Sequence, residues 1–260
     1  MKRLICSILV CVAVFGVVGP YSARAVQESG LSQAARDAGN AYLRAMAAAG
    51  AAFARRDFAT ALDKLDLADQ IAPNIVDTWN LRGAIYAEEH AYEEADDAFE
   101  KAASLSPGDF WPPYNLAELL MMQKKYGPAA DAFGKLEVYG GHEELVGFKI
   151  VFADLMGGKP DAAKPVLDAM KFPSNTPAYY FAYAAWSFAH NDAKEGTYWT
   201  NEAIKVFGPG PCVSFYQTLA DAGWLPKLNP DGTIPDKIDL SALPSATPGV
   251  DAPAHAGVVP

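Results

Sequence analysis

Four histidines are the residues of this sequence whose type could support metal binding or acid–base chemistry. His90, His142 and His190 each fall beside a turn between predicted helices, and His255 lies close to the end of the chain. A protein metal site needs three or four ligands that converge on one point, and this spacing does not bring the histidines together. We interpret each of them as a solvated residue, and the sequence predicts no bound metal.

Cys212 is the one cysteine outside residues 1–25, because Cys6 and Cys11 both fall inside that segment. It follows Pro211 at the start of a predicted helix, and a helix N-terminus can lower the pKa of a thiol and make it a nucleophile. The alternative, which we favour, is a small buried apolar residue. A single remaining cysteine also leaves no internal disulfide.

Motifs that carry catalysis in other proteins are missing from the sequence. It holds no Gly-x-Ser-x-Gly elbow, no His-Glu-x-x-His pair, no phosphate-binding glycine loop and no Cys-x-x-Cys pair. The stretch 229–233 begins like a calcium loop but lacks the further acidic ligands, so it predicts a turn. The sequence therefore favours a protein that is not an enzyme and uses no cofactor.

An acidic run stands out near the middle of the first half of the chain. Its members are Glu88, Glu89, Glu93, Glu94, Asp96, Asp97 and Glu100. Such a run is typical of a solvated helix face, although a docking site for a basic partner is the alternative. The formal net charge of the whole chain is −10, which argues against nucleic acid and anionic membrane surfaces as partners.

The elements that position these residues follow from an internal repeat of 34 residues. The same residue types return at this spacing in five columns: Phe58, Tyr92 and Tyr126; Ala61, Ala95, Ala129 and Ala163; Leu65, Phe99, Phe133 and Leu167; Ala68 and Ala102; Pro73 and Pro107. A fixed period of about 34 residues is the spacing of a two-helix unit that stacks on its neighbours.

The clearest copy of this repeat resembles the tetratricopeptide repeat (TPR) family. The matching residues are Trp79, Gly83, Tyr86, Ala95, Phe99, Ala102 and Pro107. The resemblance implies an all-α fold, a right-handed α-solenoid of helix-turn-helix hairpins. Gly83 and Ala95 are expected to be small because the two helices of a hairpin cross closely, and Pro107 is expected to end the second helix.

Outside the repeats, the sequence predicts a leader and a tail. Lys2, Arg3, an apolar run and a small-x-small site ending at Ala25 are typical of a secretory signal peptide, with a retained membrane anchor as the alternative. We therefore expect an exported, periplasmic or secreted protein that begins at Val26. The predicted order is a signal peptide (1–25), a helical lead-in (26–41), three TPR repeats (42–141), two degenerate hairpins (142–207), a capping helix (208–225) and a Pro-rich, disordered tail (226–260).

Local signals give some of the expected boundaries. Ser32 is the expected N-cap of the first helix, and second helices are expected over 128–137 and 193–207. The segment 208–211 is expected to be a break before a last helix that starts at Val213, with Trp224 and Leu225 packing back.

The resemblance implies that the first helix of each hairpin lines a concave groove that binds a partner. The sequence places an apolar stripe with some polar residues on these helices. The expected groove residues are Asn80, Glu88, Trp111, Tyr114, Glu118, Met121, Met122, Phe148, Phe152 and Phe181. The alternative is that neighbouring helices cover the stripe. The expected partner is a peptide or protein segment with apolar anchors and a basic residue.

The function that the sequence favours is a non-enzymatic protein–protein interaction scaffold or adaptor of the cell envelope or exterior. Two alternatives stay open. The first is a sugar-binding or enzymatic protein that uses the aromatic region 179–199, and the second is a self-assembly module.

Overall fold

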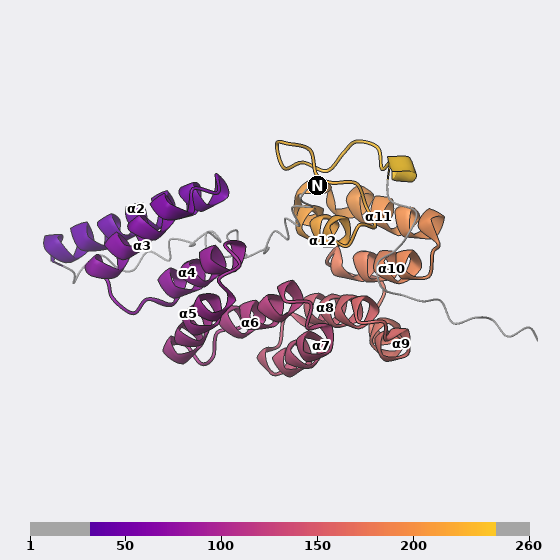
Figure 1. Ribbon diagram of the computed structural model, residues 1–260, viewed down its shortest axis with the longest axis horizontal. Helices are drawn as coiled ribbons and strands as arrows, with labels where there is room; N and C mark the ends of the chain where they lie inside the picture. Colours follow the sequence, from indigo (N-terminus) through magenta and orange to yellow (C-terminus); the bar gives the residue numbers. More distant parts are fainter. Residues whose placement is uncertain (1–31, 243–260) are drawn as a thin grey trace, which may run out of the picture. The chain divides into compact units, whose positions relative to one another are not determined.

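The computed structural model describes residues 32–242 of the chain, and every regular element in that range is a helix (Figure 1). This confirms the predicted all-α fold. The predicted signal peptide and the last residues of the predicted tail, 243–260, lie outside the described residues. Across residues 32–242, no helix combines the length and the apolar character needed to span a membrane.

The described chain forms two compact units, residues 32–122 and 123–242. The first contains α2 (Gln33–Ala54), α3 (Phe58–Ile71), α4 (Val76–Glu88), α5 (Tyr92–Leu105) and α6 (Trp111–Met122). The second contains α7 (Tyr126–Gly134), η1 (Lys135–Tyr139), α8 (Glu143–Met156), α9 (Pro160–Ala169), α10 (Ala178–Ala189), α11 (Ala193–Phe207), α12 (Pro209–Asp221) and η2 (Leu240–Ala242).

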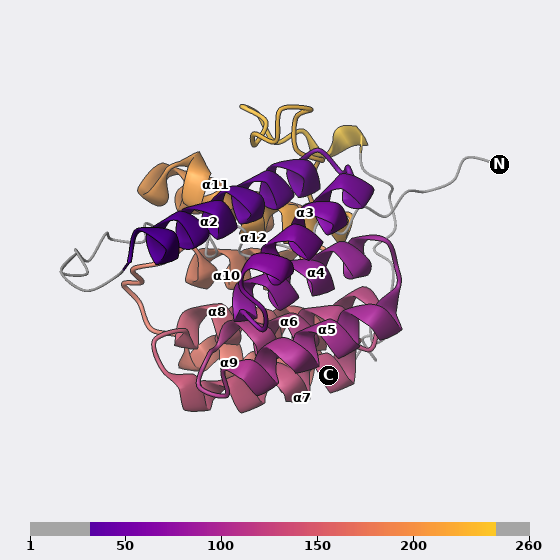
Figure 2. The same ribbon diagram turned by 90° about the vertical axis from the view of Figure 1, so that its left-hand side faces the viewer.

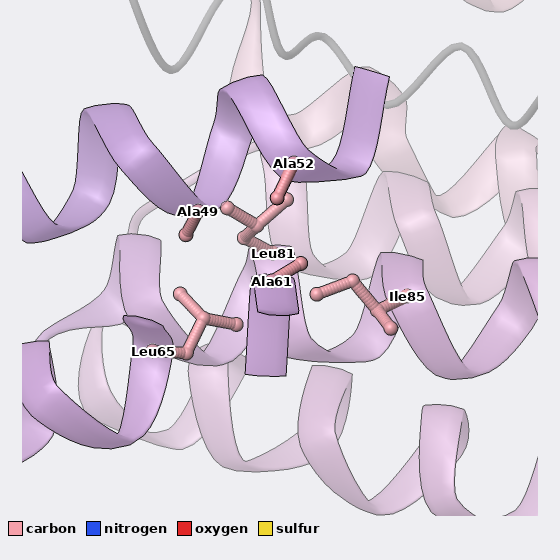
Figure 3. Close-up of a cluster of buried hydrophobic side chains, with 6 residues drawn as sticks. All are labelled: Ala49, Ala52, Ala61, Leu65, Leu81 and Ile85. Carbon is pink, nitrogen blue, oxygen red and sulfur yellow. The ribbon is translucent and has the colours of Figure 1, made fainter. Parts of the chain in front are cut away.

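In the first unit, consecutive helices pack as antiparallel hairpins, α2 on α3 and α4 on α5 (Figure 2). We call the first helix of a hairpin its A helix and the second its B helix. Alanines of α2 meet Ala61 and Leu65 of α3, and Leu81 and Ile85 of α4 complete this cluster (Figure 3). Alanine on the A helix lets the backbones approach closely, so the first hairpin is joined to the second through a tightly packed apolar core.

The crossing of α4 and α5 depends on Gly83, as the sequence predicted. A Cβ atom added to Gly83 would lie 2.7 Å from Cδ1 and Cε1 of Phe99, closer than any side chain tolerates. Ala95 is also fully buried. The aromatic ring of the B helix therefore occupies the space that the missing side chain of the A helix leaves.

The turn inside each hairpin repeats as regularly as the helices. One residue in each turn has a left-handed backbone conformation. In chain order these residues are Arg56 (φ 58°), His90 (φ 62°), Lys124 (φ 57°), Gly158 (φ 69°) and Asn191 (φ 62°). Four of these five residues have a Cβ atom, which makes the conformation unfavourable for an isolated residue. Their spacing of 34, 34, 34 and 33 residues means that the repeat continues through the less regular sequence after residue 141.

In the second unit, α8 packs on α7, α9 and α10, and α10 packs on α11. Here the large and small residues of the last hairpin have exchanged helices. A Cβ atom added to Gly196 of the B helix would lie 2.7 Å from the ring of Phe188 on the A helix. The same volume is filled from the opposite side, which explains why the sequence match fades while the hairpin persists.

Two helix boundaries differ from the sequence prediction. The segment 208–211 was expected to be a break before a helix at Val213, but α12 already begins at Pro209. Prolines are tolerated in the first turn of a helix, because the N–H groups there have no partner within the helix. In addition, the B helix expected over 128–137 ends as an α-helix at Gly134 and continues as the 3₁₀ turn η1.

The beginning of the predicted tail is ordered by local contacts. Asn229 donates its backbone N–H to the carbonyl oxygen of Thr233 at 2.9 Å, which confirms the predicted turn. Ile234 is buried, with 7% of its surface exposed, and Trp224 and Leu225 are buried as the capping prediction requires. Within residues 226–242, Ile234 is thus a point at which the tail packs, and the disorder expected for the tail as a whole stays a prediction.

Candidate partner-binding surface

The predicted groove residues of the first unit lie on two neighbouring A helices, α4 and α6, which contact each other. Five of them are buried and two are partly exposed. The buried ones are Asn80, Glu88, Tyr114, Glu118 and Met122, and the partly exposed ones are Trp111 and Met121. The surface available on α6 is therefore narrower than the sequence pattern suggests, and its exposed part is carried by Trp111 and Met121.

The aromatic end of α6 is an interlocked group of three rings. Ring centroids lie 5.1 Å apart for Phe110 and Trp111, 5.4 Å for Phe110 and Tyr114, and 5.6 Å for Trp111 and Tyr114. Only 3% of the surface of Tyr114 is exposed. Phe110 and Tyr114 thus hold the ring of Trp111 in one orientation at the surface, which reduces the entropy that a partner would lose by binding to it.

A pair of asparagines links α4 to α6. Asn115 donates Nδ2–H to Oδ1 of Asn80 at 3.4 Å, and both side chains are buried. Among the residues that the structure describes, Oδ1 of Asn115 accepts no hydrogen bond. Leaving a buried amide oxygen unsatisfied costs about 1–3 kcal/mol, so this oxygen is a vacant acceptor inside the contact between α4 and α6. The two asparagines lie 35 positions apart, one more than the repeat of 34 residues, so the repeat alone does not pair Asn115 with Asn80.

Further polar contacts join the A helices to their neighbours. Arg56, in the left-handed turn after α2, donates Nη1–H to Oε2 of Glu88 at 2.6 Å. The hydroxyl groups of Tyr42 and Thr78 lie 3.2 Å apart and connect α2 to α4. Glu88 was grouped with the acidic run by sequence; unlike the exposed carboxylates that follow on α5, it is buried and takes part in an ion pair.

The predicted groove residues of the second unit, Phe148, Phe152 and Phe181, are all buried. Phe148 and Phe181 have no exposed surface, and their rings lie 5.2 and 5.5 Å from that of Phe215 on α12. Phe152 lies 5.7 Å from Trp224. These rings fill the space between A helices and the capping helix, so they contribute packing within their own unit. A strip that they share with Trp111 of the other unit stays a prediction.

Buried polar side chains are concentrated on the A helices. In the described part of the chain, eight of the eleven buried polar or charged residues lie on α4, α6, α8 or α10. They are Thr78, Asn80, Glu88, Asn115, Glu118, Lys149, Asp154 and Ser187. The B helices α3, α5, α7 and α9 bury only apolar residues. A buried polar group stabilises a fold less than an apolar one, so the A helices carry the groups whose burial contributes least to stability.

Burial also sets the titration of isolated groups in the second unit. Cys212 has no exposed surface, which confirms the buried apolar interpretation of this residue, and desolvation raises the pKa of its thiol to about 11, which disfavours the thiolate near neutral pH. Desolvation likewise raises the pKa of Asp154 above its ordinary value, an effect that the positive charge of Lys159 partly opposes. Within residues 32–242, no three His, Cys, Asp or Glu side chains gather as a metal site requires.

These features define a protein built of helical hairpins of the TPR type, with polar residues on its A helices. The comparison with solved structures supports this fold. The structure titled "Functional Characterization of Pseudomonas Aeruginosa pilF" is similar with a TM-score of 0.52, over 72% of this chain and 83% of that chain, at 16% sequence identity. PilF contains tetratricopeptide repeats. No family model matches the sequence, and no curated protein is similar to it in sequence.

Proposed function

We propose that this protein is a non-enzymatic interaction scaffold that binds a protein segment on the A-helix face of α4 and α6. The observation that carries the proposal is the concentration of buried polar side chains on the A helices. A repeat array selected for stability alone would bury apolar residues there, as the B helices α3, α5, α7 and α9 do, since unsatisfied or charged groups reduce stability.

The chemistry of this face favours an extended peptide. The amides of Asn80 and Asn115 carry the same donor and acceptor groups as a peptide bond, and Oδ1 of Asn115 has an acceptor position that is not used within residues 32–242. Trp111 and Met121 offer apolar contact beside them, and aromatic and flexible Met side chains are frequent anchors of bound segments. Glu118 on the same helix favours a basic residue in the partner.

We also propose that the chain is exported, on the basis of the basic start, apolar run and small-x-small site in residues 1–25. Mature protein recovered from an exporting bacterial host should begin at Val26. Mass spectrometry that finds residues 1–25 still attached would remove the cell-envelope part of the proposal and leave the scaffold part standing.

The experiment that tests the scaffold compares stability with partner capture in one variant. Replacing both asparagines by leucines of similar shape, Asn80→Leu with Asn115→Leu, removes a buried hydrogen bond together with an unsatisfied oxygen. Such an exchange is nearly neutral or stabilising for folding. A photo-crosslinking amino acid at the partly exposed Met121 then reports on bound protein in the host. We expect a discrete protein adduct in the parent chain and at least a tenfold weaker adduct in the leucine variant, which corresponds to roughly 1.4 kcal/mol of binding energy.

The matched control uses the B helices. The crosslinker at Leu67 of α3, an exposed apolar position, should give no discrete adduct. Neutralising Asp96 and Asp97 of α5 should leave the Met121 adduct intact, which would also exclude the acidic face as the docking site. An adduct that persists in the leucine variant, or that forms equally at Leu67, contradicts the proposal.

A further inference from the structure

The second unit carries an exposed aromatic patch that the proposed function does not use. It consists of six rings from α10, α11 and the segment that precedes α10: Phe172, Tyr179, Tyr180, Tyr183, Tyr198 and Trp199. We call this group the aromatic platform. Among the exposed large hydrophobic residues of the described chain, the two aromatic ones, Phe172 and Tyr198, both belong to it.

Trp199 lies at the centre of the aromatic platform. Its ring centroid is 5.1 Å from that of Tyr183, 6.1 Å from Tyr180 and 6.2 Å from Tyr179. Tyr179 and Tyr180 are buried, whereas Trp199 and Tyr183 are partly exposed. The buried tyrosines therefore fix the orientation of the indole, and a ligand that binds to it would not have to order a mobile side chain.

Two more exposed rings extend the platform. Phe172 is 66% exposed, and its ring lies 5.6 Å from Tyr179. Tyr198 is 55% exposed, and its ring lies 5.5 Å from Trp199. An exposed cluster of rings, as distinct from single exposed side chains, marks a binding surface in a soluble domain.

Hydrogen-bonding groups border the rings on α11. Glu195 accepts a hydrogen bond from Nε1 of Trp199 at 3.4 Å. Lys194 and Glu202 stand four residues before and four residues after Tyr198, and residues at this spacing share one face of a helix. Charged groups of both signs therefore stand beside the rings, where they could donate to and accept from a polar ligand.

The spacing of the rings and the charge of the chain disfavour two ligand classes. Neighbouring centroids are 4.7–6.4 Å apart, so neighbouring rings pack against one another and do not form the open cage that binds an organic cation. Stacked nucleobases would bring phosphates toward a chain with a formal net charge of −10, which is unfavourable. The exposed rings are tilted, with 47° between the planes of Phe172 and Tyr179 and 70° between those of Tyr198 and Trp199. A ligand that suits this surface stacks on one ring at a time and carries hydroxyl groups for the charged side chains beside it.

We propose that the aromatic platform binds a glycan chain, with pyranose rings stacked on Trp199, Tyr198 and Phe172. The axial C–H groups of a pyranose carry a partial positive charge and face the negative π surface of an aromatic ring. Sugars linked β-1,4 with all substituents equatorial present such C–H groups on both faces, and their hydroxyl groups point outward to side chains such as Glu195 and Lys194. An open surface suits several linked sugars, because each stacked ring adds a modest contribution.

The test measures binding of soluble oligosaccharides to the chain from Val26 onward by isothermal titration calorimetry and saturation-transfer NMR. Cellohexaose and chitohexaose should bind, and isomaltohexaose, whose α-1,6 linkages do not hold successive sugars in one plane, should bind less. Tyr198→Ala and Phe172→Ala should each weaken binding by about threefold to tenfold, the range for one aromatic contact. Both residues are exposed, so neither variant should leave a cavity.

Conservative and distant substitutions serve as controls. Tyr198→Phe keeps the ring and should bind within about twofold of the parent, because stacking depends on the ring face. Val138→Ala changes a residue that is 83% exposed and is not part of the platform, and it should have no effect. Absence of measurable binding to either β-1,4 hexasaccharide overturns the proposal, as does decaproline binding that Tyr198→Ala abolishes, which would assign the rings to a proline-rich peptide.

Discussion

Gly83→Ala is the substitution that tests the hairpin geometry most directly. Replacing glycine by alanine inside a helix usually increases the free energy of unfolding, whereas at Gly83 we expect no gain or a decrease. Alanine in place of glycine stabilises a helix interior by about 1 kcal/mol. At Gly83, however, the added methyl group would lie 2.7 Å from two ring carbons of Phe99, and overpacking of this kind costs about 1–3 kcal/mol. The net expectation is a loss of roughly 0–2 kcal/mol in the free energy of unfolding.

The matched control is Gly39→Ala in α2, where a new Cβ atom would meet no atom within 4 Å. This variant should gain up to about 1 kcal/mol, so the two glycines should differ by about 1–3 kcal/mol. Urea unfolding followed by far-UV circular dichroism measures both. Equal gains at the two positions would refute the close crossing of α4 and α5.

A second background identifies the atoms responsible. Phe99→Val removes the ring carbons Cδ1 and Cε1 that the methyl group would meet. In this background, Gly83→Ala should recover the helix-propensity gain of about 1 kcal/mol. The resulting double-mutant cycle should give a coupling energy of about 1–3 kcal/mol, whereas independent sites would add within about 0.5 kcal/mol. An additive cycle would mean that Phe99 is not the residue that excludes a side chain at position 83.

Three further expectations concern the second unit. Cys212 should react with Ellman's reagent only after unfolding, because it is buried with a pKa raised to about 11; fast labelling of the native chain would contradict this. Ile234→Ala should cost about 2 kcal/mol or more in unfolding free energy, and the same change at the less buried Ile238 should cost less; equal small effects would restore the view of an unpacked tail. Asp154→Asn should stabilise the protein at pH 7, because burial raises the folded pKa and a charge near the end of α8 also opposes the helix dipole. With a raised folded pKa, the carboxyl group of Asp154 reduces stability as the pH increases above its ordinary pKa of 3.8 and through the folded pKa. The extra stability of the Asp154→Asn variant should therefore vanish on acidification. A gain in stability that does not depend on pH would contradict burial of the charge as its cause.

The fold could be predicted because the same sequence pattern recurs several times along the chain. Small and aromatic residues recur at one spacing, and each recurrence supports the same two-helix unit. Helix boundaries also followed from local chemistry. Ser32 accepts a hydrogen bond from the N–H of Ala35 at 3.2 Å, as its predicted role of N-cap requires. The B helix of the last hairpin, Ala193–Phe207, has the predicted bounds. A repeat thus provides several independent observations of each structural rule.

The features that escaped prediction depend on contacts between helices. A stripe on one helix has the same 3.6-residue pattern whether a neighbour covers it or a partner does, and this is why Tyr114 could be assigned to an open surface although it is buried. The left-handed turns at Arg56 and Lys124 carry no residue-type signal either, since neither arginine nor lysine favours that conformation. Their geometry is imposed by the two helices that each turn connects.

The contrast between A and B helices connects stability with function. The hairpin of α4 and α5 has the tight Gly83–Phe99 crossing, and its A helix also buries Asn80 and Glu88. In a repeat array each hairpin depends mainly on its neighbours, so the apolar cluster that α4 shares with the alanines of α2 can offset polar groups that would destabilise a hairpin on its own. The Asn80→Leu, Asn115→Leu change should therefore stabilise the Leu65→Ala protein more than it stabilises the parent protein, because Leu65→Ala weakens the cluster. An equal gain in the free energy of unfolding in both backgrounds would mean that the apolar cluster and the buried asparagines act independently.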